Sequence, residues 1–162
     1  MEPGPIATDD AASIAKFRDA GHKLIMWHGW ADQLIMPQGS IDYYNEVTKT
    51  VSGGDVSETQ RWFRFFMAPG EPHCAMDTSG AFESLVQWVE QGVAPKTILH
   101  QVSKTTTRPL CPHPTVAVYK GSGSTDDAAN FECGENPVAD TEDTNARLNT
   151  RLFGKPFLPS HE

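Results

Sequence analysis

The stretch KLIMWHG, residues 23–29, decides the fold of this chain. The apolar run from Lys23 to Trp27 is short and nearly continuous, and it ends at His28 and Gly29. This pattern is typical of a strand buried on both faces in a parallel sheet, and the run is too short for three turns of helix. We therefore predict a strand here.

Helices and strands alternate on either side of this strand. The spacing of apolar residues predicts helices over residues 14–20, 40–51 and 80–92, and an aromatic-rich strand over residues 61–67. In the last of these helices we expect Phe82, Leu85, Val86 and Val89 to face the sheet, with Trp88 extending that face. Strand, helix and strand in this order predict an α/β layered fold.

The C-terminal half is less regular. Residues 97–102 and 115–119 read as short edge strands, and the three prolines between positions 109 and 114 argue against a regular element between them. Residues 126–143 hold seven acidic and no basic side chains, which predicts a solvated loop or an irregular tail.

Charge and hydropathy exclude several classes of protein. Thirteen basic and 21 acidic side chains give a net charge of -8, which makes nucleic acid an unfavourable partner, although acidity also serves solubility alone. No apolar run approaches the ~20 residues of a membrane helix. Residues 1–10 lack the pattern of a secretory signal, so we expect either an intracellular protein or an incomplete precursor.

Cys74, Cys111 and Cys133 form no C-x-x-C pair, and the histidines show no metal-ligand spacing. Cys111 could pair with Cys133, which would leave Cys74 without a partner, or all three could be free thiols. The residues alone leave both possibilities open.

Asp32 and His73 stand out because each follows a predicted strand directly. Ligands and catalytic groups of open α/β sheets gather beyond the carboxyl ends of the strands, so both side chains should lie on one rim. An Asp that accepts a hydrogen bond from one imidazole nitrogen leaves the other nitrogen to act as a general base. Each residue alone also suits an ordinary turn or a hydrogen-bonded side chain. We expect the pair to be hydrogen-bonded neighbours.

Several motifs in the same order resemble the tannase and feruloyl esterase family of secreted α/β-hydrolases. They are KLIMWHGWADQLIMPQGSIDYY from residue 23, FRFFMAPGEPHC from residue 63, WVEQGVAP from residue 88 and RPLCPHPTVAVYKGSGSTDDAANFEC from residue 108. The resemblance covers roughly residues 23–133. It implies the C-terminal part of an α/β-hydrolase sheet with flanking helices over residues 1–100, followed by a loop-rich extension over residues 101–162.

The resemblance also implies roles for single residues. Asp32 matches the acid and His73 the base of a Ser-His-Asp triad. Cys74 matches a cysteine bridged to one directly before the nucleophilic serine, and Cys111 and Cys133 match a structural disulfide. The implied activity is hydrolysis of aromatic carboxylic esters by a secreted enzyme.

One part of the family pattern is missing, because no serine lies in a G-x-S-x-G-like elbow ahead of Asp32. Ser40 and Ser79 lie near predicted helix starts, where they read as caps, and Ser122 and Ser124 lie in a glycine-serine run. The nucleophile, the partner of Cys74 and the calcium-holding lid of the family would then lie upstream. We therefore expect no cofactor in this segment and no triad-type activity from the 162 residues alone.

Two other classes compete with the esterase hypothesis. The chain could be a truncated, non-catalytic product or a small binding module that retains part of the fold, with Asp32 and His73 as relics. A metal-binding domain that uses cysteines and histidines is the third possibility.

Overall fold

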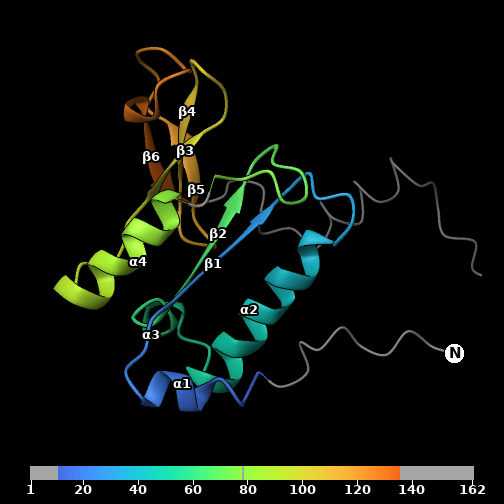
Figure 1. Ribbon diagram of the computed structural model, residues 1–162, viewed down its shortest axis with the longest axis vertical. Helices are drawn as coiled ribbons and strands as arrows, with labels where there is room; N and C mark the ends of the chain where they lie inside the picture. The colour runs from blue at the N-terminus through green and yellow to red at the C-terminus, as the bar shows by residue number, and fades with distance from the viewer. Residues whose placement is uncertain (1–10, 78, 136–162) are drawn as a thin grey trace, which may run out of the picture.

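The computed structural model describes residues 11–77 and 79–135, and its arrangement is α/β (Figure 1). The helices and strands follow in the order α1 (Ala15–Asp19), β1 (Leu24–Gly29), α2 (Pro37–Val51), α3 (Val56–Thr59), β2 (Phe63–Ala68), α4 (Ser79–Gln91), β3 (Ile98–Gln101), β4 (Thr107–Leu110), β5 (Val116–Tyr119), a 3-10 turn η1 (Ala128–Asn130) and β6 (Phe131–Gly134). None of the described helices is long and apolar enough to span a membrane.

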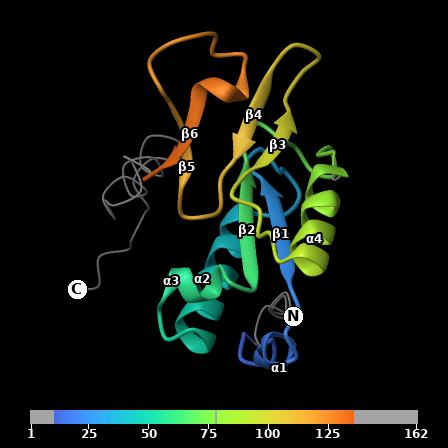
Figure 2. The same cartoon turned by 90° about the vertical axis from the view of Figure 1, so that its left-hand side faces the viewer.

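The centre of the fold is the parallel pair of β1 and β2. Leu24 lies opposite Phe63 and Gly29 opposite Ala68, so both strands end at the same edge. Helix α2 packs on one face of the pair and α4 on the other, as Figures 1 and 2 show from two directions. This is the layered βαβ arrangement that the sequence predicts, and it places the residues that follow each strand on one rim.

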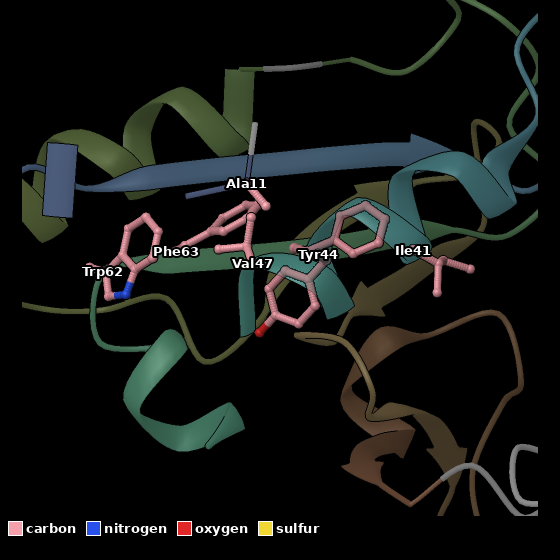
Figure 3. Packing of buried hydrophobic residues seen from close by; sticks show 7 residues of the cluster. Ala11, Ile41, Tyr44, Val47, Trp62 and Phe63 are labelled. Atoms are coloured by element: carbon pink, nitrogen blue, oxygen red, sulfur yellow. The ribbon is translucent and has the colours of Figure 1, made fainter. Parts of the chain in front are cut away.

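The face toward α2 carries an aromatic core. Alternate residues of β2 point to this side, and Phe63 and Phe65 are completely buried against Tyr44 and Val47 of α2 (Figure 3). The Tyr44 ring meets the Phe63 ring edge-on, with 5.0 Å between the ring centroids. Burying one such side chain contributes roughly 1.5–3 kcal/mol, so this face is the main anchor of α2.

Helix α4 covers the other face with a stripe that differs from the predicted one. Ala81 and Trp88 are buried and Leu85 is partly buried, whereas Phe82 and Val89 are 68% and 62% exposed. The prediction that Phe82 and Val89 face the sheet is therefore wrong. Ala81, Leu85 and Trp88 repeat at helical spacing just as well, and the Trp88 ring also lies against the cations of Arg64 and Lys23.

Two antiparallel hairpins follow, β3 with β4 and β5 with β6. The strands predicted over residues 97–102 and 115–119 appear as β3 and β5. The expectation of no regular element around the prolines is wrong, because Pro109 lies inside β4. Its partner is Leu99 of β3, and β4 has no second strand neighbour in the described residues, so the strand tolerates a residue without an N–H.

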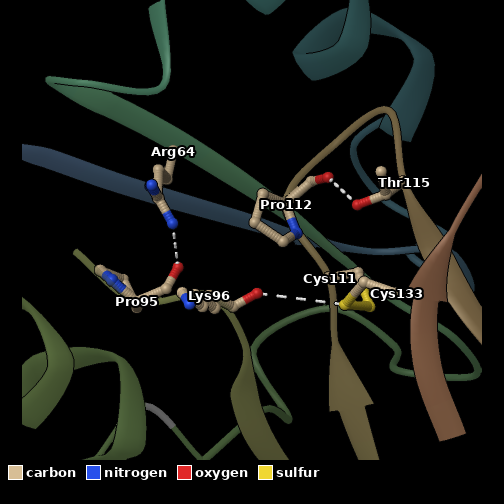
Figure 4. The surroundings of a disulfide bond; sticks show 7 residues. All are labelled: Arg64, Pro95, Lys96, Cys111, Pro112, Thr115 and Cys133. Atoms are coloured by element: carbon tan, nitrogen blue, oxygen red, sulfur yellow. Dashed lines mark hydrogen bonds between the residues drawn. A yellow bond between two sulfur atoms is a disulfide. The ribbon is translucent and has the colours of Figure 1, made fainter. Parts of the chain in front are cut away.

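A disulfide joins Cys111, directly after β4, to Cys133 in β6, with 5.6 Å between the Cα atoms (Figure 4). Part of the acidic stretch from residue 126 is therefore structured, since residues 128–134 form η1 and β6, in contrast to the predicted loop. Residues 136–143 of that stretch lie outside the described residues. Phe66 of β2 pairs with Pro112, the residue after Cys111, so the β1–β2 pair and the hairpins share contacts, and Arg64 donates to the Pro95 carbonyl nearby (Figure 4).

Candidate active site

Asp32 and His73 lie together at the carboxyl edge of the parallel pair, as the sequence predicts. The His73 Nδ1 atom is 2.9 Å from Asp32 Oδ2 and 3.1 Å from Asp32 Oδ1. The Asp32 side chain is 8% exposed and that of His73 is 29% exposed. An N–H at Nδ1 thus donates to a shielded carboxylate.

The loop after β1 holds the Asp32 carboxylate in place. Its Oδ1 atom accepts the backbone N–H groups of Leu34 and Ile35, each at 2.9 Å, which is the local pattern of an Asx turn. The Ile35 hydrogen bond is the main cause that lowers the pKa of Asp32 far below its usual range. Burial opposes this shift, and His73 and the Leu34 N–H reinforce it. Asp32 is therefore ionised at neutral pH.

A second imidazole contacts the same carboxylate. His28 Nε2 lies 3.2 Å from Asp32 Oδ2 and 3.2 Å from the Ile35 carbonyl, and His28 Nδ1 lies 2.7 Å from Ser40 Oγ. Two acceptors at Nε2 place a proton on that nitrogen, and Nδ1 forms its hydrogen bond with the Ser40 hydroxyl. Both nitrogens of His28 are therefore engaged.

His73 differs from His28 because one of its nitrogens is available. Within residues 11–77 and 79–135, no protein group forms a hydrogen bond with His73 Nε2. An imidazole whose Nδ1–H is fixed by a carboxylate and whose Nε2 is unoccupied has the arrangement of a general base. His73 therefore has a ring nitrogen free of protein partners in the described residues, whereas both ring nitrogens of His28 are engaged.

These side chains border a cavity of about 390 Å³ at the end of the two strands. The cavity is lined by Trp27, His28, Gly29, Asp32, Glu71, Pro72, His73, Cys74 and Met76. Cys74 is exposed and unpaired, and its backbone φ of 58° lies in the left-handed region, which is uncommon for a residue other than glycine. The site therefore combines a carboxylate, an imidazole and a free thiol around one opening.

The serines that the sequence places near helix starts have different environments. Ser79 begins α4, and its N–H is capped by the Asp77 side chain at 2.9 Å. Ser40 is no cap, since α2 begins at Pro37 with Met36 as its N-cap residue. The Ser40 hydroxyl is engaged with His28 and does not line the cavity.

Two features of the site were not predicted from the sequence. One is the contact of His28 with Asp32, for which the only signal is the four-residue separation across a strand end. The other is an ion pair between Glu71 and His100, 29 residues apart, which no local pattern indicates. In the described residues no group of three or more His, Cys, Asp or Glu side chains could hold a metal ion. The calcium expectation concerns residues upstream of this chain and stays an expectation.

Comparisons with known proteins show the family of the chain. The family profile "Tannase and feruloyl esterase" matches residues 6–134. A probable feruloyl esterase of Arthroderma benhamiae is 41% identical over 140 residues, which cover 79% of this chain and 26% of that protein. A mono(2-hydroxyethyl) terephthalate hydrolase of Piscinibacter sakaiensis is 35% identical over 145 residues, covering 83% of this chain and 23% of the relative.

Solved structures are similar too. Feruloyl esterase B from Aspergillus oryzae superposes with a TM-score of 0.68 at 28% identity, over 75% of this chain and 28% of that one. Tannin acyl hydrolase from Aspergillus niger gives a TM-score of 0.64 at 26% identity, over 74% of this chain and 24% of that one. The chain thus spans about a quarter of the length of these relatives. It has an α/β fold and belongs to the tannase and feruloyl esterase family of carboxylic ester hydrolases.

Proposed function

We propose that this chain carries the acid and the base of a Ser-His-Asp triad in a secreted carboxylic ester hydrolase. The observation that carries the proposal is the pair of short contacts from His73 Nδ1 to the Asp32 carboxylate, together with the unoccupied His73 Nε2 at the cavity. The expected substrates are aromatic esters, in which hydroxycinnamic or gallic acid is joined to sugars or polyphenols.

The chemistry follows from these positions. His73 Nε2 takes the proton of a serine hydroxyl while the serine oxygen attacks the ester carbonyl, and the resulting imidazolium is stabilised by ionised Asp32. Nε2 then protonates the leaving alcohol, which produces an acyl-enzyme. Water, activated by the same nitrogen, attacks the acyl-enzyme and releases the carboxylic acid.

The nucleophile in this proposal comes from an upstream portion of the same enzyme. The edge of β1 away from β2 pairs with no strand in the described part of the chain, and the loop beside Asp32 exposes Trp30, Leu34, Ile35 and Met36. A further segment of the enzyme would pair with this free sheet edge and bury the exposed apolar side chains. Cys74 would pair with a cysteine directly before the serine. This bridge would clamp base and nucleophile together.

Secretion is part of the same proposal. The Cys111–Cys133 disulfide suits an oxidising compartment, because thiols in the cytosol are kept reduced. The net charge of -8 fits a small uncharged or aromatic ligand better than nucleic acid or anionic lipid.

The test restores the proposed upstream portion, either in trans or as one chain, and measures hydrolysis of a feruloyl ester. His73→Ala should lower kcat/KM by roughly 10³–10⁴ or more, because the triad acts as a unit. His22→Ala is the matched control, since His22 is exposed and lies outside the cavity lining. Unchanged turnover in His73→Ala would disprove the assignment. The 162 residues alone should show no triad-type turnover.

A further inference from the structure

A buried ion pair lies behind the loop that carries His73. His100 Nε2 is 2.9 Å from Glu71 Oε1, and the side chains are 3% and 14% exposed. The contact joins β3 to the loop between β2 and α4. A buried imidazole N–H needs an acceptor, and a buried carboxylate needs a donor, so neither partner can be lost without leaving the other unsatisfied.

Glu71 is also fixed to the end of β1 by its backbone. Its carbonyl accepts the Ala31 N–H at 3.1 Å, and the contact with β1 is so close that a Cβ on Gly29 would lie 2.1 Å from this oxygen. The backbone of Glu71 is thus hydrogen-bonded to the end of β1, and its side chain is bonded to β3.

His73 lies only two residues farther along the chain. The residue between them is Pro72, whose ring fixes φ near -65°, so the position of Glu71 restricts where the His73 backbone can lie. The His73 N–H itself has a weak contact, 3.4 Å to Gln33 Oε1. A hydrogen bond such as the one from His73 Nδ1 to Asp32 weakens steeply when its geometry is bent or lengthened.

We propose that His100 is a positioning residue that acts through Glu71 to hold the His73 imidazole against Asp32. The inference deepens the proposed function, since it rests on His73 as the base. Within the described residues His100 forms no hydrogen bond with Asp32 or His73, and its effect passes through the loop. Loss of the pair should let the loop move by a fraction of an ångström or more, and displacements of about 1 Å can lower catalytic rates by ~10².

The experiment uses the 162-residue chain labelled with ¹⁵N and needs no catalysis. Long-range ¹H–¹⁵N spectra give the fraction of His73 in the Nδ1–H tautomer, and hydrogen exchange gives the protection of the Ala31 amide. In His100→Phe and Glu71→Ala we expect the Nδ1–H fraction to fall and the Ala31 amide to exchange about tenfold faster. Glu71→Gln keeps an acceptor for His100 Nε2 and should stay close to the parent protein.

Glu58→Gln is the matched control, because it removes a carboxylate from an exposed ion pair with Arg61 at 3.0 Å. It should change neither signal. Slow amide exchange at Phe65 in β2 shows that a variant has kept its core.

A folded His100→Phe protein with an unchanged His73 tautomer and unchanged Ala31 protection would overturn the proposal. Unfolding of both His100→Phe and Glu71→Ala would also contradict it, because the pair would then support the core rather than the loop. The proposed function fails on a different result, unchanged ester hydrolysis in His73→Ala, which these spectra do not measure.

Discussion

His73 Nδ1 lies 2.9 Å from Asp32 Oδ2, although the two residues are 41 positions apart in the sequence, with helices α2 and α3 and strand β2 between them. The parallel register of β1 and β2 brings them together, because both strands end at the same edge and each residue follows its strand within a few positions. The hydrogen-bonded pair of Asp32 and His73 is therefore a direct product of the parallel β1–β2 register.

Replacing Asp32 by Asn should keep the size of the side chain and remove its charge. Without a carboxylate acceptor, His73 loses the preference for the Nδ1–H tautomer, and kcat/KM of the enzyme with its upstream portion should fall by about 10⁴. NMR of the chain alone measures the first effect and ester hydrolysis the second. Asp42→Asn, on the exposed side of α2, serves as the control. Parent-like turnover of Asp32→Asn would contradict the acid assignment.

Replacing His28 by Phe should have a smaller effect, because His28 supports Asp32 and does not react. The change removes the contact to Asp32 Oδ2 and leaves the Ser40 hydroxyl without its His28 partner. We expect kcat to fall by ~10–100-fold with little change in KM, as for residues that orient catalytic ligands. Ser40→Ala should lower kcat less. A loss as large as that of His73→Ala would instead identify His28 as a reacting group.

Gly29→Ala and Gly39→Ala form a matched pair of glycine substitutions. A Cβ at Gly29 would lie 2.1 Å from the Glu71 carbonyl oxygen, whereas nothing lies within 4 Å of a Cβ at Gly39 in α2. Gly29→Ala should destabilise the fold by ~1–3 kcal/mol and displace the loop that carries His73. Gly39→Ala should stabilise it by up to ~1 kcal/mol. Urea unfolding measures both, and equal effects of the two changes would refute the close contact.

The Cys111–Cys133 disulfide closes a loop with a sequence separation of 22 residues. Replacing both cysteines by Ser should lower the free energy of unfolding by about 3 kcal/mol by the chain-entropy argument. Cys74→Ser is the control, because this exposed thiol has no partner in the structure and its replacement should leave the denaturation midpoint unchanged. An equal loss in both proteins would show that the disulfide is not a stabilising element.

Stability should decline in acid partly through Asp55, which caps α3. Its side chain accepts the Ser57 hydroxyl and the N–H groups of Ser57 and Glu58, and these bonds lower its pKa below the usual value. A carboxyl with a depressed folded-state pKa contributes stability above its unfolded pKa of ~4, and that contribution disappears as the pH falls through the folded value. Unfolding free energies of the parent and Asp55→Asn should therefore differ at pH 7 and converge toward pH 2. A constant difference would contradict this.

The sequence predicts best those elements whose pattern of apolar residues fits only one kind of secondary structure. The apolar runs ending at His28 and near Ala68 fit only buried strands, and they place Asp32 and His73 correctly. The face of α4 was mispredicted because two stripes, one through Phe82 and one through Trp88, share the helical period. Which of them is buried depends on Arg64 and the sheet, and the sequence of the helix does not contain that information.

The remaining features that the sequence does not predict involve residues that are far apart in the chain and meet only in the folded protein. Pro109 has no N–H to donate, so it fits a strand only where no neighbouring strand needs that donor. This condition depends on the assembled hairpin and not on the local sequence. Glu71 and His100 meet because β3 passes behind the loop, and neither residue belongs to a motif. Short-range patterns identified the triad candidates, while their supporting residues depend on tertiary packing.

The open side of β1 has a practical consequence for anyone who prepares this polypeptide by itself. In the described residues this edge pairs with no other strand and lies next to the solvent-facing Leu34 and Met36, so it offers a template on which identical molecules can stack. Refolding yield should consequently drop as concentration rises, and co-production with the upstream portion proposed above should restore it. Light scattering across a dilution series would show whether the protein is monomeric or associated at each concentration.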